Sequence, residues 1–396
     1  MLQDKYFNRL EWVVFWLLVL LYTLPIWRWH YFLTIDGPTH LYNAWLLKTM
    51  LLTPASGFHQ WLAFNLSPEP NYLSHLLLSG LMTAMPPWLA EKLVQTLYVV
   101  SLPLAMRYLL RSWQPAAGFL AVLVFPLIYS VVFLYGFYNF CLSLVFLLLV
   151  LGYWRRHLAP TLPPAAAIWK LAGLVALLFF SHPLTYLVSG LLLGLLLVEQ
   201  VLRRQLASWA ATGRAFGAVA LAYLPTLPLL GWYFWQKGTA TDYPADSYRT
   251  NFAEWLRLAP LRHMTSDAGF HAPLGANLTT LRLLAGTEAI YLRLYALLLL
   301  GGLLYAAWRL LRRQAAGWVW AWWLAASLMV LAFVFLPDGI SGGSVIRPRW
   351  GLFSCLSQWR PCPGPEPGHW QVWRPAWPTT WLATGCSCGF ARLPGC

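Results

Sequence analysis

The chain has 396 residues, of which 59% are hydrophobic and 10% are charged, and its formal net charge is +14. Soluble domains average about 25% charged residues, so this composition excludes an ordinary water-soluble globular protein. The basic residues stand in short clusters at the ends of apolar runs, which is typical of membrane topology and excludes a nucleic-acid-binding face.

Apolar runs of membrane-spanning length recur along the chain. A spanning helix needs about 20 apolar residues, because the hydrocarbon core is about 30 Å thick and each residue rises about 1.5 Å. The pattern predicts an all-α fold, a polytopic transmembrane helical bundle. Its predicted spans are 11–27, 92–110, 117–135, 137–154, 168–181, 184–200, 214–235, 288–308 and 317–336. The shorter run 72–86 lies between polar residues and Pro86-Pro87, and we expect that it does not cross the membrane.

The basic clusters predict which side each connecting loop occupies. They are Lys5 and Arg9, Arg107 and Arg111, Arg155 and Arg156, Arg203 and Arg204, and Arg309, Arg312 and Arg313. The positive-inside rule assigns all of them to the cytoplasm, provided that 72–86 does not span. Two larger loops, about 28–71 and 236–287, then lie on the extracytoplasmic side. The expected location is the inner (plasma) membrane, with the lipid bilayer as solvent.

The first polar segment after the first predicted span is Thr34 to Leu41. Gly37-Pro38 is typical of a turn that starts a helix. Residues 40–51 have apolar side chains at helical spacing, which predicts a helix lying on the membrane surface. Asp36 is therefore expected at the start of this helix, either as its N-terminal cap or as a functional carboxylate, and the two roles are compatible.

Three other segments carry candidate site residues. Glu69 lies in a proline-rich turn and is either a site residue or a solvated loop charge. His182 interrupts an apolar stretch and faces either a cavity or the interface, because an unpaired histidine is costly in lipid. Arg347 and Arg349 follow a glycine-rich segment and either bind a phosphate or anchor the next helix at the headgroups.

A carboxylate just after the first membrane helix, followed by an interfacial helix, resembles the GT-C superfamily of membrane glycosyltransferases, in its bacterial form. The resemblance covers residues 1–353. It implies that Asp36 is the catalytic base and that the donor is a polyprenyl-phosphate-linked sugar. The acceptor is then an extracytoplasmic glycan, lipid or protein. Some branches have paired acids in this loop, but here Gly37 follows Asp36.

The same resemblance implies roles for the remaining candidates. Arg347 and Arg349 would stabilise the departing phosphate, and Glu69 would be a second acid near the site. His40 and His182 would donate hydrogen bonds to the sugar or the phosphate.

No nucleotide-binding signature is present, neither a Walker A loop nor G-x-G-x-x-G after a strand, which disfavours a nucleotide-sugar donor and ATP-driven transport. No cofactor or metal site is indicated. The rival class is a lipid or polysaccharide transporter or polymerase of the cell envelope. In that class the same polar groups would line a pathway, and internal repeats would be expected, of which none is convincing.

The last segment, 354–396, differs from the rest in composition. It is rich in Pro, Trp and Cys without helical periodicity, and we expect it to be disordered. It holds five of the six cysteines, which are Cys355, Cys362, Cys386, Cys388 and Cys396. Their spacing matches no zinc pattern, so we expect a shifted reading frame that truncates the natural protein rather than a metal or disulfide knot.

Overall fold

The computed structural model describes residues 2–64, 67–159, 163–206, 208–239, 324–325 and 327–329. Every regular element in these ranges is helical, as the sequence predicts. The predicted spans 288–308 and 317–336, most of the 236–287 loop and the 354–396 tail lie outside the described residues, apart from two short helical pieces near 324–329.

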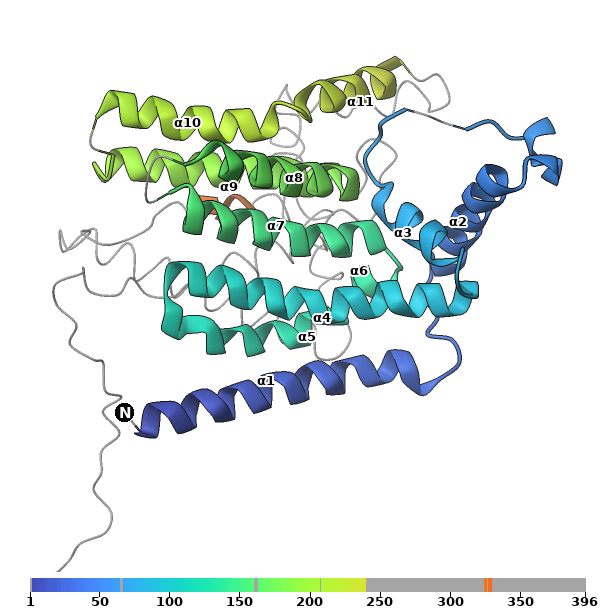
Figure 1. Ribbon diagram of the computed structural model, residues 1–396, viewed down its shortest axis with the longest axis horizontal. Coiled ribbons are helices and arrows are strands. Elements are labelled where there is room, and N and C mark those ends of the chain that lie inside the picture. Colours follow the sequence, from blue (N-terminus) through green and yellow to red (C-terminus); the bar gives the residue numbers. More distant parts are fainter. Residues whose placement is uncertain are drawn as a thin grey trace, which may run out of the picture. The chain divides into compact units, whose positions relative to one another are not determined.

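Four helices of the described part are long and apolar enough to cross a membrane. They are α1 (Leu2–Arg28), α4 (Pro87–Trp113), α7 (Tyr138–His157) and α9 (Pro183–Leu202). Helices α1, α4 and α9 each contain a predicted run, and α7 contains all but the first residue of the run 137–154. The chain is therefore a helical protein with several membrane-spanning candidates, and α4 packs between α1 and α7 (Figure 1).

Two predicted spans are not single straight helices. The 117–135 run forms η3 (Pro115–Val124), α5 (Phe125–Ile128) and α6 (Val131–Leu134). Pro126 cannot donate to the Val122 carbonyl as an α-helix requires, and the Phe125 amide bonds that carbonyl instead. A 3₁₀ helix rises about 2.0 Å per residue, so these ten residues of η3 still cover roughly 20 Å.

The 214–235 run is also divided. It forms α10 (Trp209–Tyr223) and α11 (Leu227–Thr239), which meet at an angle of 52°. Pro225 and Pro228 lie at this junction, where the missing amide protons prevent a continuous helix. The predicted run 168–181 forms α8 (Ala165–Ser181), a shorter apolar helix of 17 residues.

Between α1 and α4, the described residues form no helix long enough to span a membrane. It forms α2 (Gly37–Leu52), the short turns η1 (Pro54–Ser56) and η2 (Phe58–Gln60), and α3 (Leu73–Leu81). α2 confirms the helix predicted at 40–51. The nine residues of α3 cover only about 13.5 Å at 1.5 Å per residue, which supports the interpretation that 72–86 does not cross.

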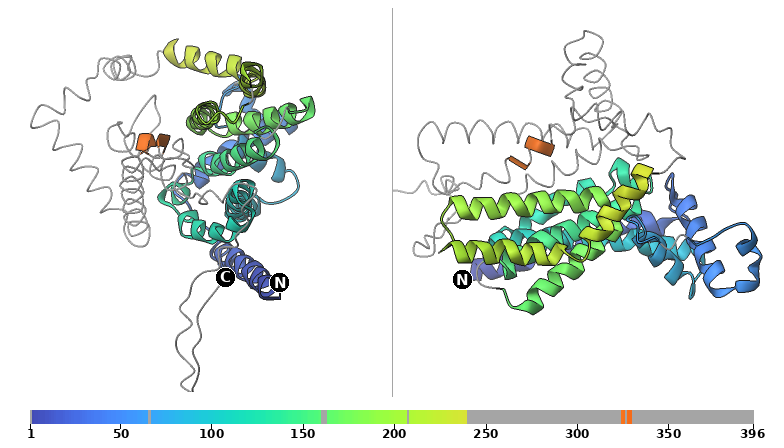
Figure 2. Two further views of the ribbon diagram at one scale, coloured as in Figure 1. Left: turned by 90° about the vertical axis from the view of Figure 1, so that its left-hand side faces the viewer. Right: turned by 90° about the horizontal axis from the view of Figure 1, so that it is seen from above.

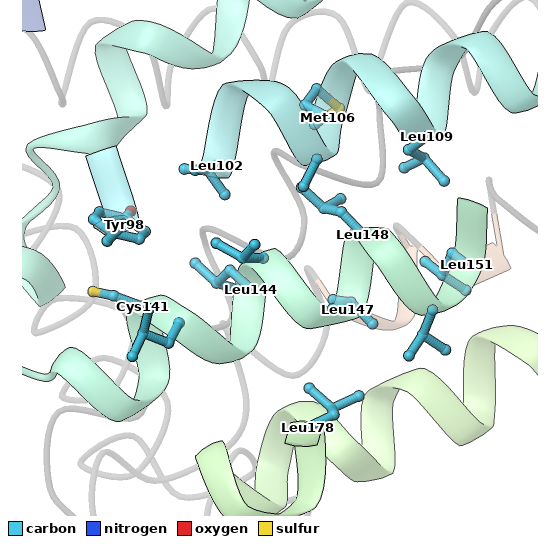
Figure 3. Packing of buried hydrophobic residues seen from close by; sticks show 14 of the residues in the cluster. Tyr98, Leu102, Met106, Leu109, Cys141, Leu144, Leu147, Leu148, Leu151 and Leu178 are labelled. Atoms are coloured by element: carbon cyan, nitrogen blue, oxygen red, sulfur yellow. The ribbon is translucent and has the colours of Figure 1, made fainter. Parts of the chain in front are cut away.

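The packed centre of the bundle lies between α4 and α7, with Leu178 of α8 beyond α7 (Figure 3). Tyr98, Leu102 and Met106 of α4 are buried against Leu144 and Leu148 of α7. A Cβ at Gly152 would lie 2.8 Å from the Tyr108 ring, so this glycine allows the two helices to approach closely.

The basic residues of several helices meet at one end of the bundle. Arg107 of α4 forms a two-pronged ion pair with Glu11 of α1. The Arg155 guanidinium lies 5.7 Å from the centre of the Trp113 ring, and Glu199 is the acid that faces it. The basic clusters of α4, α7 and α9 therefore lie at the same end of the bundle, and the assignment of this end to the cytoplasm stays a prediction. Seen from its left-hand side the bundle shows its helices foreshortened, and seen from above it shows them lengthwise (Figure 2).

Candidate functional site

Asp36 is held on a turn that packs against the loop before α7, at the end of the helices away from the basic clusters. The Ile35 amide donates to the Leu134 carbonyl at 3.1 Å, and the Asp36 amide donates to the Tyr135 carbonyl at 2.8 Å. Gly136 has φ of +87°, and a Cβ there would lie 3.1 Å from the Asp36 nitrogen. The two backbones are therefore in direct contact, which places Asp36 on a rigid support.

The carboxylate of Asp36 is not used as a helix cap. Asp36 occupies the N-cap position of α2, as predicted, but its side chain makes no capping hydrogen bond, and its φ of −92° and ψ of −3° are helical. An N-cap normally has extended backbone and accepts from an amide in the first turn. Within the described part of the chain, its half-buried carboxylate makes no hydrogen bond or ion pair.

A buried polar network lies beneath this turn, centred on the Tyr138 hydroxyl. That hydroxyl donates to Glu91 Oε1 at 2.6 Å, accepts from Gln95 Nε2 at 2.9 Å, and lies 2.8 Å from Thr34 Oγ1. All these side chains are buried. Our sequence analysis missed Glu91 and Tyr138. The available signal was an acidic residue within the first turns of a mostly apolar helix, because such a residue is costly to bury unless it has a function or a partner.

Gly37 brings Glu91 against the first residue of α2. A Cβ at position 37 would lie 2.5 Å from Thr34 Oγ1, 2.9 Å from Tyr138 OH and closer still to Glu91 Oε1. These atoms fill the space that any other side chain would need. The site therefore has a second carboxylate near Asp36, supplied by α4 and not by the neighbouring position in the loop.

His40 and His75 form a pair beside the network. His40 Nδ1 lies 3.0 Å from His75 Nε2, and His75 Nδ1 lies 3.3 Å from the Asn71 carbonyl. Burial lowers the pKa of His40 to about 4, with the charge of His75 adding to this and the Gly136 carbonyl opposing it. Burial also lowers the pKa of His75. Both rings are therefore neutral at pH 7, and each can donate or accept according to its tautomer.

Asn139 fixes the start of α3 beside these histidines. Its side-chain oxygen accepts from the Ser74 amide at 2.7 Å and its nitrogen donates to the Asn71 carbonyl at 2.5 Å. The Tyr72 amide donates to the Phe180 carbonyl at 3.0 Å. These bonds tie the His75 helix to α7 and to the end of α8.

Of the four predicted site residues in the described ranges, two lie together and two lie elsewhere. Asp36 and His40 belong to this site. His182 is buried at the junction of α8 and α9, where its ring lies 5.1 Å from that of Phe140. Glu69 is half-buried and faces the Gln236 amide of α11 at 3.3 Å when the amide nitrogen is turned toward it. These contacts of His182 and Glu69 lead to Phe140 and Gln236 and not to Asp36.

The predicted phosphate-binding residues Arg347 and Arg349 lie outside the described residues. Within the described part, no group of three or more His, Cys, Asp or Glu side chains could hold a metal ion. Comparison of the chain with protein-family models, with curated proteins and with solved structures finds no match.

Proposed function

We propose that this protein is a membrane glycosyltransferase of the GT-C type. It would transfer a sugar from a polyprenyl-phosphate-linked donor to a glycan, lipid or protein acceptor outside the cytoplasm. The observation that carries the proposal is Asp36. Its carboxylate stands on a rigidly held turn next to the bundle and is used neither as a cap nor in an ion pair in the described structure.

In the proposed reaction the acceptor hydroxyl attacks the anomeric carbon of the donor sugar while Asp36 takes its proton. The new glycosidic bond forms as the bond to the phosphate oxygen breaks, and the bonding electrons leave with the phosphate. An ionised carboxylate also favours the positive charge that develops on the sugar ring in such transfers.

The other residues would bind substrate groups. His40 lies one helical turn after Asp36 on α2, so its side chain is on the same side of the helix. Together with His75 it would hydrogen bond a sugar hydroxyl or a phosphate oxygen. Arg347 and Arg349 would stabilise the departing phosphate, a role in which a single donor contributes roughly 3–4 kcal/mol. Glu69 and His182 remain candidates for contacts to the sugar.

One observation favours a second candidate, a lipid or polysaccharide transporter. Helices α10 and α11 form a broken pair bent by 52°, and broken helices line the substrate sites of many transporters. The two functions differ in their product, because a transporter moves its substrate across the membrane without forming a glycosidic bond.

The change Asp36→Asn tests the proposed function. Asparagine has nearly the same shape and Asp36 makes no capping bond, so the variant should fold normally. Loss of a general base lowers turnover by roughly 10²–10⁴-fold. We expect that drop in membrane vesicles supplied with a radiolabelled polyprenyl-phosphate sugar, with product measured in the lipid and glycan fractions.

A matched control is Glu199→Gln, another carboxylate-to-amide change. Glu199 pairs with Arg203 at the basic end, 2.8 Å away. Its loss should reduce the amount of folded protein at most, and turnover per folded molecule should be kept. Full transfer by the Asp36→Asn variant would remove Asp36 from the mechanism. Translocation of the labelled lipid without a new glycoside would favour the transporter.

A further inference from the structure

Glu91 is a buried acid of α4, a mostly apolar helix. No step of the proposed reaction uses this side chain. It is 6% exposed and begins the second turn of α4, a candidate membrane span. Burying a carboxylate costs several kcal/mol unless hydrogen bonds or charges compensate. Because burying this carboxylate costs free energy, Glu91 is a candidate for a functional role.

We propose that Glu91 is a positioning residue for Asp36, acting through the Tyr138 hydroxyl and through Gly37. The inference rests on the proposed function for the role of Asp36, but the placement of the turn can be measured without it.

The first connection between Glu91 and the Asp36 turn is a directed chain of hydrogen bonds. Tyr138 has a single hydroxyl proton, and the 2.6 Å contact is the length expected when that proton is donated to a carboxylate. The lone pairs of the same hydroxyl then accept from Gln95 Nε2 at 2.9 Å and from Thr34 Oγ1 at 2.8 Å. Glu91 thus sets the direction of bonds that end at Thr34, two residues before Asp36.

The second connection is steric and lies on the other side of Asp36. Glu91 Oε1 occupies the space next to Gly37 that a β-carbon would fill. A carboxylate near the first residue of a helix is also favoured by the exposed amides and the dipole there. Glu91 therefore contacts the residue after Asp36 and reaches the residue two before it, which leaves the turn little freedom.

The benefit of this arrangement is geometric. A reacting group displaced by about 1 Å can lose roughly 10²-fold in rate, because its orientation toward the attacked bond is lost. In the described structure the Asp36 side chain has no bond of its own to hold it, so its position depends on the backbone of the turn. Glu91 is the buried side chain that contacts this backbone at Gly37 and, through Tyr138, at Thr34.

Three variants test the proposal. Glu91→Leu removes the acceptor, Glu91→Gln keeps an oxygen that can still accept from Tyr138, and Tyr138→Phe removes the hydroxyl while keeping the ring. We expect Glu91→Leu and Tyr138→Phe to lower kcat roughly 10²-fold with little change in KM, as a misplaced base would. Glu91→Gln should restore most of the rate, which a need for the charge itself would not allow.

Hydrogen–deuterium exchange gives a readout that is independent of turnover. The amides of Ile35 and Asp36 are bonded to Leu134 and Tyr135, so a peptide covering 33–41 should be protected in the wild-type protein. We expect faster exchange of this peptide in Glu91→Leu and Tyr138→Phe, wild-type exchange in Glu91→Gln, and no change in the α9 peptide 183–202 in any variant.

The outcomes separate the two proposals. Unchanged exchange of 33–41 in both Glu91→Leu and Tyr138→Phe would overturn the positioning role. So would a Glu91→Gln variant as impaired as Glu91→Leu. If the wild-type protein transfers no sugar but the exchange pattern is as expected, the proposed function fails and the positioning of the Asp36 turn by Glu91 stands.

Discussion

Gly37→Ala places one methyl group in the most crowded part of the site. The added carbon would lie 2.5 Å from Thr34 Oγ1 and 2.9 Å from Tyr138 OH, and closer to Glu91 Oε1. Ordinary contact begins near 3.4 Å, so these atoms must move by about 0.5–1 Å. All three belong to one buried network, and the movement therefore disturbs several hydrogen bonds together.

The expected cost follows from these contacts. Overpacking a buried site costs about 1–3 kcal/mol. Complete loss of a hydrogen bond to a charged group destabilises the protein by about 1.5–3 kcal/mol more. Replacing glycine by alanine restricts the unfolded chain and returns about 0.4–1 kcal/mol. We expect a net loss of roughly 2–5 kcal/mol, together with faster exchange of the 33–41 peptide.

The matched control is Gly173→Ala in α8. No atom lies within 4 Å of the added carbon there, and the position is exposed. This variant should keep or slightly raise the stability, since alanine is the better helix former by up to about 1 kcal/mol. The assay is thermal unfolding of both purified proteins in the same detergent. A Gly37→Ala protein as stable as Gly173→Ala would refute the close packing of Glu91 against α2.

Two further predictions concern topology and pH. For topology, single cysteines are introduced at Ala55 and Gln205, both of which are exposed, in a chain whose tail cysteines are changed to serine. Ala55→Cys should react with an impermeant thiol reagent in intact cells, and Gln205→Cys should not. The reverse labelling would overturn the placement of the site. The pKa of His40 falls from 6.5 to about 4 on folding, so the unfolded chain binds a proton in that pH range that the folded chain does not. Stability should be full above about pH 6.5 and fall as the pH drops toward 4, by at most roughly 3 kcal/mol. Burial of His75 acts in the same direction, and a melting temperature that is equal at pH 7.5 and 5 would contradict this effect.

Much of the helical framework follows from local sequence. A membrane span needs only a run of about 20 apolar residues, and the helix start at Gly37-Pro38 needs only its neighbours, so both can be predicted without a structure. The breaks in the 117–135 and 214–235 runs were also within reach. Pro126 and Pro225 stand inside those runs, and an interior proline removes a helix hydrogen bond. Our predicted spans were too uniform because hydropathy outweighed these signals.

The candidate site was only half predictable. Asp36 and His40 lie in one polar segment and were found from it. Their partners come from elsewhere in the chain: Tyr138 is 104 positions from Thr34 and 47 from Glu91, and His75 is 35 positions from His40. No periodicity or motif links positions so far apart, because side chains are brought together by helix packing and not by spacing.

The amino-acid sequence by itself determined that this chain is a helical membrane protein, where its apolar runs lie and which residues begin its first polar segment. Those properties depend on the transfer of short segments from water to lipid, which is decided locally. Only the tertiary structure decided that Glu91 lies against Gly37 and that Tyr138 joins it to the Asp36 turn. A buried carboxylate in a mostly apolar helix is stable only where hydrogen-bond donors from other elements reach it and a glycine leaves room for it. Both conditions depend on how the helices pack in the folded chain.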